Sequence, residues 1–412
     1  MRAVRLLAAV MYCIILITLT FTFAARLGAT ENEESNPMKI VGYFPRWGMY
    51  SSYFVKNVVT SGAAGQLTHL DYAFANVVNN RCVSFDPWAD YQAPLAAQHS
   101  VNGQSDSHGA FAGNFHQLQE LKKLYPHLKI IMSIGGGNVN ANAFRSAALG
   151  QNRQAFVKSC VDMYIRGNFA PGISEPGIFD GFDVDWEFPA SNADRDNFTS
   201  LLADFRHALD AVRPGLTLAI AGPNGHWAYQ YIDLDHVQQY LDYVGVMTYD
   251  YDGPWKYNTG LVAPLYRSLK DPEPNNNASA TVEGYLEAGV PAGKIVFGVP
   301  FYGYEWSNVP NVDNGLFEPG APDGQGAAYN SIVSIESQFQ KRRDSITQAV
   351  WLYNGSHFWT YDDATSIKFK MEYVRSQKLA GVMAWNLGQD LADGSLLNAV
   401  VSGLSPKTMP LN

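Results

Sequence analysis

The sequence predicts an α/β fold, a (β/α)8 (TIM) barrel with a small α+β insertion between its seventh and eighth strands. Three observations predict it: eight compact apolar runs recur along the chain, helical patterns lie between them, and no GxGxxG motif follows any run. Strands that alternate with helices form a parallel sheet, and eight of them favour a closed barrel over an open doubly wound sheet. A chain of 412 residues, 47% hydrophobic and 16% charged, can bury such a core.

The predicted strands are rich in β-branched and aromatic residues and apolar nearly throughout, as parallel strands buried on both faces should be. They are Lys39–Pro45, Thr68–Val77, Lys129–Gly137, Ile178–Phe188, Leu216–Pro223, Tyr243–Asp250, Lys294–Gly303 and Ala380–Leu387. The clearest helical patterns are Phe115–Tyr125, Arg153–Gly167, Asn192–Arg213, Val282–Gly289 and Asp363–Gln377. We therefore expect the barrel domain to span residues 38–405.

Two intervals between the predicted strands are too long for ordinary loops. Val78–Gly113 follows the second strand and is rich in Asp, Gln, Ser and Gly. Residues 304–357 follow the seventh strand and combine a loop-like stretch, a helix-like piece and the strand-like QAVWLYN. We expect the second interval to be the α+β insertion. Insertions at the C-terminal ends of barrel strands line the active-site mouth.

The first 29 residues are expected to be a signal peptide. Arg2 and Arg5 precede an apolar run, Leu6–Ala25, and small residues follow it. An uncleaved membrane anchor is the alternative, because about 20 apolar residues can span a bilayer. The signal peptide predicts a secreted, extracellular protein that has no membrane attachment once the signal is removed.

The cysteines and the net charge of the chain limit which metals, cofactors and macromolecules it is expected to bind. Cys13 lies in the predicted signal, which leaves Cys82 and Cys160 in the mature chain. They could form one disulfide in an oxidising compartment, or Cys160 could be a buried thiol. Two cysteines without nearby histidine pairs make no zinc site, so we expect no metal and no cofactor. The net charge of -9 argues against nucleic acid, whose partners carry a basic excess.

The segment FDGFDVDWEFP, Phe179–Pro189, carries a row of acidic residues. Side chains alternate along a strand, so Asp183, Asp185 and Glu187 share the face that points into the barrel, whereas Asp180 has the opposite parity and is interpreted as structural. Like charges this close disfavour mutual ionisation, and no Lys or Arg lies in the strand to compensate. The row therefore indicates a catalytic site, in which Asp185 raises the pKa of Glu187 so that Glu187 can protonate a leaving group.

The position of these carboxylates on one strand also indicates a mechanism. Most retaining glycosidases place two carboxylates on opposite faces of the sugar ring. Neighbours on a single strand cannot readily do this. The row therefore favours the exception in which the substrate supplies its own nucleophile.

DGFDVDWE (residues 180–187) resembles the DxxDxDxE signature of family 18 glycoside hydrolases, the chitinases, with every acidic position present. Other family motifs occur in the expected order: SIGG (133–136) resembles SxGG, MTYD (247–250) resembles MxYD, GVPFYG (298–303) matches the seventh strand, and Trp385 matches the eighth-strand Trp. The resemblance extends from about Lys39 to Leu387. The predicted insertion resembles the chitinase insertion domain that deepens the cleft.

The resemblance implies that Glu187 is the general acid and later the base, that Asp185 orients the substrate's N-acetyl group, and that Asp183 shares a proton with Asp185. Tyr249 would hydrogen-bond the acetamido group, and Trp385 would form the floor under the sugar. The other substrate-binding residues expected in the cleft are Tyr43, Phe74, Gly136, Gly137, Phe188, Met247, Asp250 and Trp255.

Three positions depart from the family pattern, and all concern binding rather than the acid itself. Gly137 stands where many relatives have an aromatic residue, Phe188 replaces a frequent Tyr, and Tyr304 replaces a common Arg. A stacking surface on the leaving-group side is therefore expected to be missing at Gly137. Trp255 could compensate for it.

The resemblance implies a secreted, monomeric chitinase that hydrolyses the β-1,4 N-acetylglucosamine linkages of chitin or chitooligosaccharides by substrate-assisted retaining catalysis. A chitin-binding lectin on the same scaffold is the alternative, although such lectins usually lose the acid that is intact here as Glu187. An endo-acting enzyme on N-linked glycans shares the acidic row but typically lacks the insertion.

Overall fold

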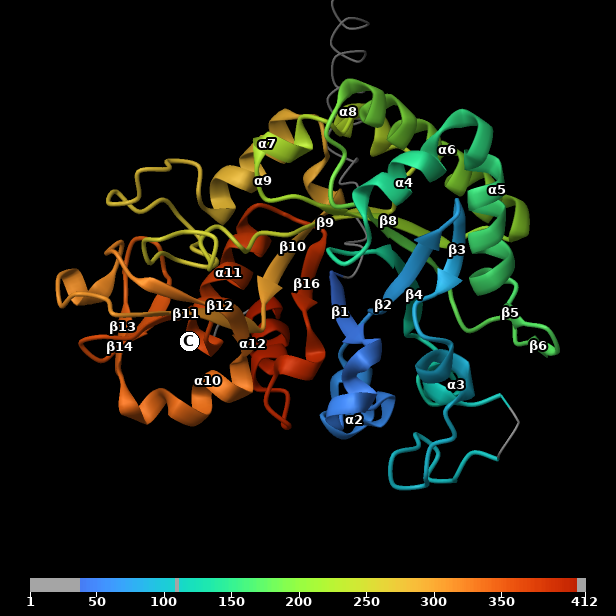
Figure 1. Ribbon diagram of the computed structural model, residues 1–412, viewed down its shortest axis with the longest axis horizontal. Helices are drawn as coiled ribbons and strands as arrows, with labels where there is room; N and C mark the ends of the chain where they lie inside the picture. Colours follow the sequence, from blue (N-terminus) through green and yellow to red (C-terminus); the bar gives the residue numbers. More distant parts are fainter. Residues whose placement is uncertain (1–37, 108–110, 406–412) are drawn as a thin grey trace, which may run out of the picture. The chain divides into compact units, whose positions relative to one another are not determined.

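The computed structural model describes residues 38–107 and 111–405. Its centre is a closed barrel of eight parallel strands in the order β1-β16-β10-β9-β8-β7-β4-β2, closed by pairing of β1 with β2 (Figure 1). Each predicted apolar run holds one barrel strand, so the predicted fold class is confirmed. The strands are β1 (Lys39–Pro45), β2 (His69–Val78), β4 (Lys129–Gly135), β7 (Gly181–Asp185), β8 (Thr217–Gly222), β9 (Tyr243–Val246), β10 (Ile295–Pro300) and β16 (Gly381–Trp385).

Burial explains why these strands are apolar nearly throughout. Every residue of β7, β8, β9 and β10 is buried, because one face points into the barrel and the other packs on helices. Only three acidic residues occur in the eight barrel strands: Asp71 on β2, and Asp183 and Asp185 on β7. All three are at most 5% exposed. Among the barrel strands, acidic side chains are thus confined to β2 and β7.

Helices surround the strands (Figure 1). The predicted helices are present as α3, α5, α6, α9 and α11, whereas α2, α4, α7, α8 and α12 were not predicted. Ser191 caps α6 by accepting a hydrogen bond from the Asp194 N–H at 3.1 Å. The helices are α2 (Val55–Thr60), α3 (Gly113–Leu124), α4 (Ala141–Ala148), α5 (Gly150–Cys160), α6 (Asn192–Val212), α7 (His226–Tyr229), α8 (Leu234–Val237), α9 (Ala278–Glu287), α10 (Tyr329–Ile335), α11 (Ala364–Ser376) and α12 (Ser395–Leu404).

The interval after β2, which is too long for an ordinary loop, begins with a β-hairpin that was not predicted. β3 (Arg81–Ser84) pairs antiparallel with the end of β2, and Asn79 and Asn80 form the turn with φ values of 50° and 58°. Asparagine tolerates these positive values, which two-residue hairpin turns require. The Asn-Asn pair was therefore a local turn signal. The short antiparallel β5 (Asn168–Ala170) and β6 (Ile173–Ser174) form a second small ribbon before β7.

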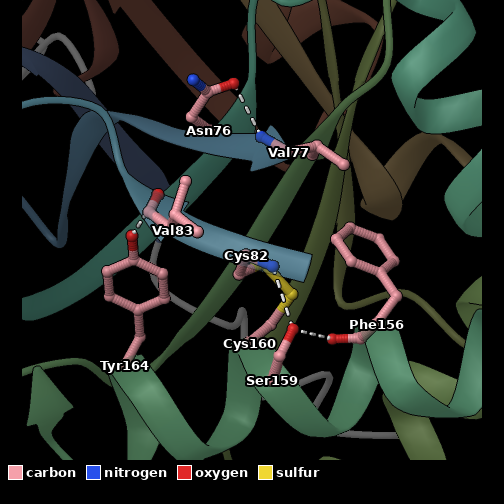
Figure 2. Close-up of a disulfide and its surroundings, with 8 residues drawn as sticks. All are labelled: Asn76, Val77, Cys82, Val83, Phe156, Ser159, Cys160 and Tyr164. Atoms are coloured by element: carbon pink, nitrogen blue, oxygen red, sulfur yellow. Dashed lines mark hydrogen bonds between the residues drawn. A yellow bond between two sulfur atoms is a disulfide. The ribbon is translucent and has the colours of Figure 1, made fainter. Parts of the chain in front are cut away.

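A disulfide joins this hairpin to a barrel helix. Cys82 of β3 is bonded to Cys160 at the end of α5, with a Cα–Cα distance of 4.9 Å (Figure 2). The Ser159 hydroxyl reinforces the link by accepting a hydrogen bond from the Cys82 N–H at 2.9 Å. Of the two interpretations left open by the sequence, the disulfide is the one that the structure shows.

We expect loss of this disulfide to destabilise the fold. The bond closes a loop with a sequence separation of 78 residues, for which the chain-entropy relation predicts about 4 kcal/mol. The double variant Cys82→Ala/Cys160→Ala should lower the urea midpoint accordingly, and the slope should rise because the denatured chain without the cross-link exposes more surface. Reduction of the wild-type protein with dithiothreitol is the matched control and should reproduce the loss. An unchanged midpoint would show that the bond adds nothing to stability.

Between β10 and β16 the chain forms a five-stranded antiparallel sheet in the order β12-β11-β15-β14-β13, beside the barrel (Figure 1). It carries the helix α10 and a small apolar core around Trp306, Trp351 and Phe358. Its strands are β11 (Tyr302–Ser307), β12 (Ala321–Ala328), β13 (Gln340–Arg343), β14 (Val350–Tyr353) and β15 (Phe358–Tyr361). The sheet therefore begins before residue 304 and continues past residue 357.

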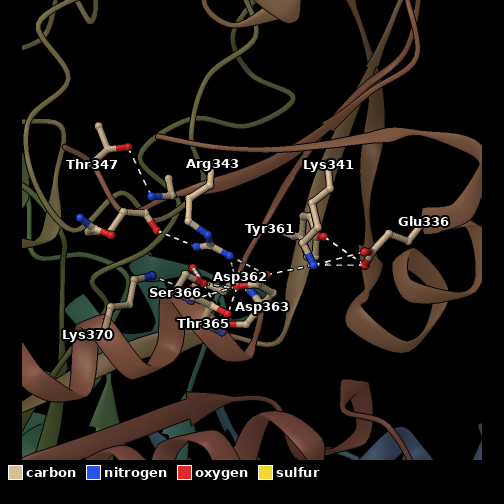
Figure 3. A network of polar contacts seen from close by, with 12 residues as sticks. Glu336, Lys341, Arg343, Thr347, Tyr361, Asp362, Asp363, Thr365, Ser366 and Lys370 are labelled. Carbon is tan, nitrogen blue, oxygen red and sulfur yellow. Dashed lines mark hydrogen bonds and ion pairs between the residues drawn. The ribbon is translucent and has the colours of Figure 1, made fainter. Parts of the chain in front are cut away.

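Charged residues fasten this sheet to the barrel helix α11 (Figure 3). Asp363 caps α11 and accepts from Arg343 of β13 at 2.6 Å. Lys370 of α11 pairs with Asp362, and both side chains are at most 2% exposed. Because breaking a buried pair leaves an uncompensated charge, these contacts hold the sheet in one orientation against the barrel.

The predicted signal peptide and its alternative, a membrane anchor, lie outside the described residues. Within residues 38–107 and 111–405, no helix has the length and apolar character needed to cross a membrane.

Candidate active site

The acidic row lies where β7 ends, at the C-terminal mouth of the barrel. Asp183 and Asp185 point to the same side of β7, and Glu187 follows directly after the strand. Two hydroxyl groups donate to Asp183 Oδ2: Tyr43 from β1 at 2.9 Å and Ser133 from β4 at 2.7 Å. Asp183 is therefore held by three barrel strands. Asp185 Oδ1 is buried and has no hydrogen-bond partner, which is unusual for a carboxyl oxygen in a protein interior.

The environment shifts the pKa values of all three carboxyl groups. Burial raises the pKa of Asp183, and the donors Ser133 and Tyr43 counteract part of this increase. Burial, then the charges of Glu187 and Asp183, raise the pKa of Asp185 well above its ordinary value. The two hydroxyl donors favour the ionised form of Asp183, whereas burial and the neighbouring charges favour the protonated form of Asp185.

Burial raises the pKa of Glu187 to about 7, and the charge of Asp250 adds to the effect. The Gly137 N–H donates to Glu187 and lowers its pKa slightly against these causes. The acidic row predicted a raised pKa for Glu187, with the charge of Asp185 as its cause. The structure instead assigns the increase to burial first and Asp250 second. Glu187 can therefore carry a proton below about pH 7 and lose it above.

Asp250 faces Glu187 from the residue stretch after β9. Its φ is 61°, and its Oδ1 accepts from the hydroxyl groups of Tyr302 at 2.6 Å and Tyr304 at 2.9 Å. Tyr304, which stands where relatives often have Arg, thus contacts an expected substrate-binding carboxylate. The tyrosines orient Asp250 without neutralising it, so its charge still acts on Glu187.

One cavity, of about 400 Å³, opens on one side of Glu187. Trp385 forms part of its wall and packs against Phe74, with ring centroids 5.4 Å apart, and edge-on against Tyr43 at 5.3 Å. Most of the predicted site residues line this cavity: Tyr43, Phe74, Gly137, Asp185, Glu187, Met247, Tyr249, Asp250 and Trp385. Four further lining residues were not predicted: Trp47, Asn138, Ala221 and Tyr302. An aromatic wall beside a buried acid suits a sugar ring.

A second cavity, of about 610 Å³, opens on the other side of Glu187. Phe188 and Trp255, both predicted, line it together with Trp227, which was not predicted. Trp227 packs edge-on against Phe188 with centroids 5.5 Å apart, and it is 63% exposed. The two cavities share Glu187, Met247, Tyr249 and Asp250, so they form one cleft with Glu187 at the junction.

Two predicted residues lie outside the lining of both cavities. Gly136 has a φ of 79°, and a Cβ there would come within 2.5 Å of the Phe74 ring, so this glycine allows Phe74 to pack. Asp183 lies beneath Asp185 and reaches the cleft only through it. By contrast, a Cβ at Gly137 would lie 3.5 Å from Glu187 Oε2. Gly137 therefore leaves the approach to Glu187 open.

Asp180 has the structural role that its parity indicated. It lies before β7, at the opposite end of the strand from the cleft. Its carboxylate accepts from Lys122 Nζ at 2.6 Å, from the Ile130 N–H at 3.0 Å and from Arg213 at 3.1 Å. It thus ties β4, α3 and the end of α6 together.

Comparison with known proteins decides the family. The family model described as Glycosyl hydrolases family 18 matches residues 39–390. The chain belongs to this family. The family 18 hydrolase is 33% identical to Chitinase C of Streptomyces lividans, over 86% of its own chain and 58% of the relative. It is 32% identical to Chitinase 63 of Streptomyces plicatus, over 92% and 62%. It therefore spans about three fifths of the length of these curated relatives.

Solved structures show the same fold. The catalytic domain of psychrophilic chitinase B from Arthrobacter TAD20 is 31% identical, with a TM-score of 0.83 over 90% of this chain and 95% of that chain. The Group IV chitinase of Ostrinia furnacalis, solved in complex with allosamidin, is 27% identical, with a TM-score of 0.76 over 89% and 98%. The family 18 hydrolase thus matches the Arthrobacter catalytic domain nearly end to end.

Two of the residues that sequence reasoning missed in this family 18 hydrolase, both Trp, share one property. Trp47 and Trp227 are at least 37% exposed and follow closely after β1 and β8. An exposed Trp just past the C-terminal end of a barrel strand points to the mouth, and this signal could have found both. In the described ranges, no group of three or more His, Cys, Asp or Glu side chains is arranged to hold a metal ion.

Proposed function

We propose that this family 18 hydrolase is a secreted, monomeric chitinase that cleaves β-1,4 N-acetylglucosamine linkages in chitin or chitooligosaccharides. The observation that carries the proposal is the position of Glu187. A carboxyl group with a pKa of about 7 lies at the junction of two sugar-sized cavities, and Asp185, whose pKa is raised well above its ordinary value, lies two residues before it at the end of β7. The names of the relatives support the substrate class.

The first step transfers the Glu187 proton to the glycosidic oxygen while the bond between that oxygen and the anomeric carbon breaks. The carbonyl oxygen of the sugar's own N-acetyl group attacks the anomeric carbon from the other face and forms an oxazolinium ion. Asp185 orients this acetamido group, and the Tyr249 hydroxyl, buried at 6% exposure, holds it from the opposite wall. Because no protein nucleophile is needed, one carboxylic acid at the scissile bond is enough.

In the second step Glu187, now ionised, takes a proton from water. The resulting hydroxide equivalent attacks the anomeric carbon and reopens the oxazolinium ring with overall retention of configuration. Trp385, Phe74 and Tyr43 support the sugar that carries the acetamido group. Phe188, Trp227 and Trp255 provide apolar surface for the leaving chain, which compensates for the glycine at position 137.

We expect the protein to cleave chitohexaose into shorter chitooligosaccharides. Chromatography of the products measures this cleavage. Chitin binding without release of soluble sugar would favour the lectin. Release of N-linked glycans from a glycoprotein, with chitohexaose untouched, would favour the endo-acting alternative. The product lengths also separate endo from exo cleavage.

The pH dependence of kcat/KM is expected to follow Glu187. The acid must be protonated in the first step, so kcat/KM should fall as pH rises through about 7, tenfold per pH unit beyond it. Asp250→Asn removes the charge that is the second cause of the raised pKa and should move this alkaline limb to lower pH. A limb that stays in place in Asp250→Asn would refute the electrostatic coupling of the two residues.

A further inference from the structure

Asp71 is the one acidic residue of the barrel strands that the catalytic scheme does not use. It lies on β2, and its side chain is 0% exposed. Its Oδ1 has no hydrogen-bond partner. Its Oδ2 accepts from the Tyr243 hydroxyl of β9 at 3.4 Å, which is a long bond. A buried carboxyl group with so few donors requires an explanation.

The groups around Asp71 provide no compensating cation. Asp183 of β7 and the hydroxyl groups of Tyr43 and Tyr243 are close enough to interact with it. On its own strand, burial and the charges of Lys129 and Lys39 lower the pKa of His69 to about 3, which leaves that ring neutral. These two lysines stand at the starts of β4 and β1, and Lys39 lies 5.9 Å from the Tyr243 ring centre.

Elementary electrostatics decides the charge of Asp71. An ionised carboxylate in a low-dielectric interior needs a cation or several donors, and a group without them takes up a proton instead. Burial, and then the charge of Asp183, raise the pKa of Asp71 well above its ordinary value, against a small lowering by Tyr243. Asp183 differs because two short hydroxyl donors stabilise its anion.

We propose that Asp71 is a positioning residue, a neutral carboxylic acid beneath the acidic row that leaves the negative charge of the barrel interior on Asp183. The Asp183 anion in turn keeps the proton on Asp185, which orients the substrate. An ionised Asp71 would drive a proton onto Asp183, and Asp185 would lose the charge that holds its own proton. The link to catalysis rests on the proposed function, whereas the protonation of Asp71 does not.

Infrared difference spectroscopy tests the protonation directly. At about pH 8, one unit above the pKa of about 7 of Glu187 and Asp90, these two groups are mostly ionised. The wild type minus Asp71→Asn difference should then show the carbonyl band of a protonated carboxyl group. Asp90→Asn, which alters a buried carboxyl group outside the row, is the matched control and should leave that band in place. Absence of the band from the difference overturns the proposal.

Tyr243→Phe provides a second test that does not depend on the folding of Asp71→Asn. Removing the hydroxyl group that donates to Asp71 should move the same band to higher frequency without abolishing it, because a carbonyl that accepts a weaker hydrogen bond has a stiffer bond. A change confined to the carboxylate bands would mean that Asp71 is ionised and would overturn the proposal.

The pH dependence of urea unfolding provides a third test, because the proposal predicts the direction in which stability changes with pH. When an acid is protonated in the native state and ionised in the unfolded chain, the protein loses stability as pH rises from the pKa of that acid in the unfolded chain to its pKa in the folded protein. Asp71→Asn lacks this dependence, so the ratio of wild-type to variant unfolding constants should rise about tenfold per pH unit above about 4. A ratio independent of pH overturns the proposal.

The pH profile of activity separates this inference from the proposed function. If Asp71 is neutral throughout the active range, the alkaline limbs of kcat/KM for Asp71→Asn and the wild type should coincide. A limb shifted to lower pH would reveal a lost negative charge and overturn the proposal. If the protein cleaves no chitooligosaccharide, the proposed function fails, while the infrared and urea measurements still decide the state of Asp71.

Discussion

Replacing Glu187 with glutamine is expected to abolish release of chitooligosaccharides while binding to insoluble chitin persists. Glutamine keeps the size and polarity of the side chain but can neither donate the proton in the first step nor accept one in the second. General acid–base catalysis contributes about 10²–10⁴-fold, and one residue performs both transfers here, so we expect a loss at the upper end of that range. Reducing-sugar release and a chitin pull-down measure the two properties separately.

Glu287→Gln is the matched control for this experiment. Glu287 is exposed on α9 and lines neither cavity, so the same chemical change there should leave activity unaltered. Activity of Glu187→Gln within a few fold of the wild type would exclude Glu187 as the acid. Loss of chitin binding together with activity would instead indicate that the variant disturbs the cleft.

The second large effect is expected for Asp185→Asn. Asp185 is 5% exposed, and no protein group forms a hydrogen bond with its Oδ1. The amide retains the shape but cannot exchange a proton with Asp183 or Glu187 as the acetamido group turns toward the anomeric carbon. Loss of one preorganised hydrogen-bonding group of this kind lowers kcat by about 10²–10³-fold. Steady-state kinetics on a chromogenic chitobioside should show this loss mainly in kcat.

Asp90→Asn controls for the loss of a buried carboxyl group as such. Asp90 is 1% exposed, and it accepts from Tyr72 at 2.5 Å on the outer side of β2, away from both cavities. Its substitution should lower stability more than kcat. If Asp185→Asn changed KM and left kcat intact, Asp185 would contribute to binding only.

The parts of the fold that sequence predicted well are those governed by local pattern. Strands such as β8 and β10 are buried on both faces, so their apolar runs identify them without knowledge of their neighbours. The acidic row was equally readable, because alternation along β7 alone places Asp183 and Asp185 on one face. The disulfide remained open because Cys82 and Cys160 are separated by 78 residues and only the approach of β3 to α5 brings them together.

Contacts between distant strands were beyond prediction for the same reason. A Trp shortly after β8 indicates the barrel mouth, but the packing of Trp227 on Phe188 arises only because the segment after β8 approaches the end of β7. The raised pKa of Glu187 was expected, but its cause was not, since Asp250 reaches it across the barrel mouth. The sequence around Asp71 does not indicate its role, because that role depends on the hydrogen-bond donors and cations that are missing around it in the folded interior.

By itself, therefore, the sequence determined the barrel, the family and the residue that carries the proton, since each depends on short-range periodicity or on a contiguous motif. Only the tertiary structure decided where the protons rest, which aromatic side chains line the two halves of the cleft, and how the insertion sheet is held. Those properties depend on burial and on distances between strands far apart in the chain. Closure of β1 onto β2 brings such residues together, and no local pattern records that proximity.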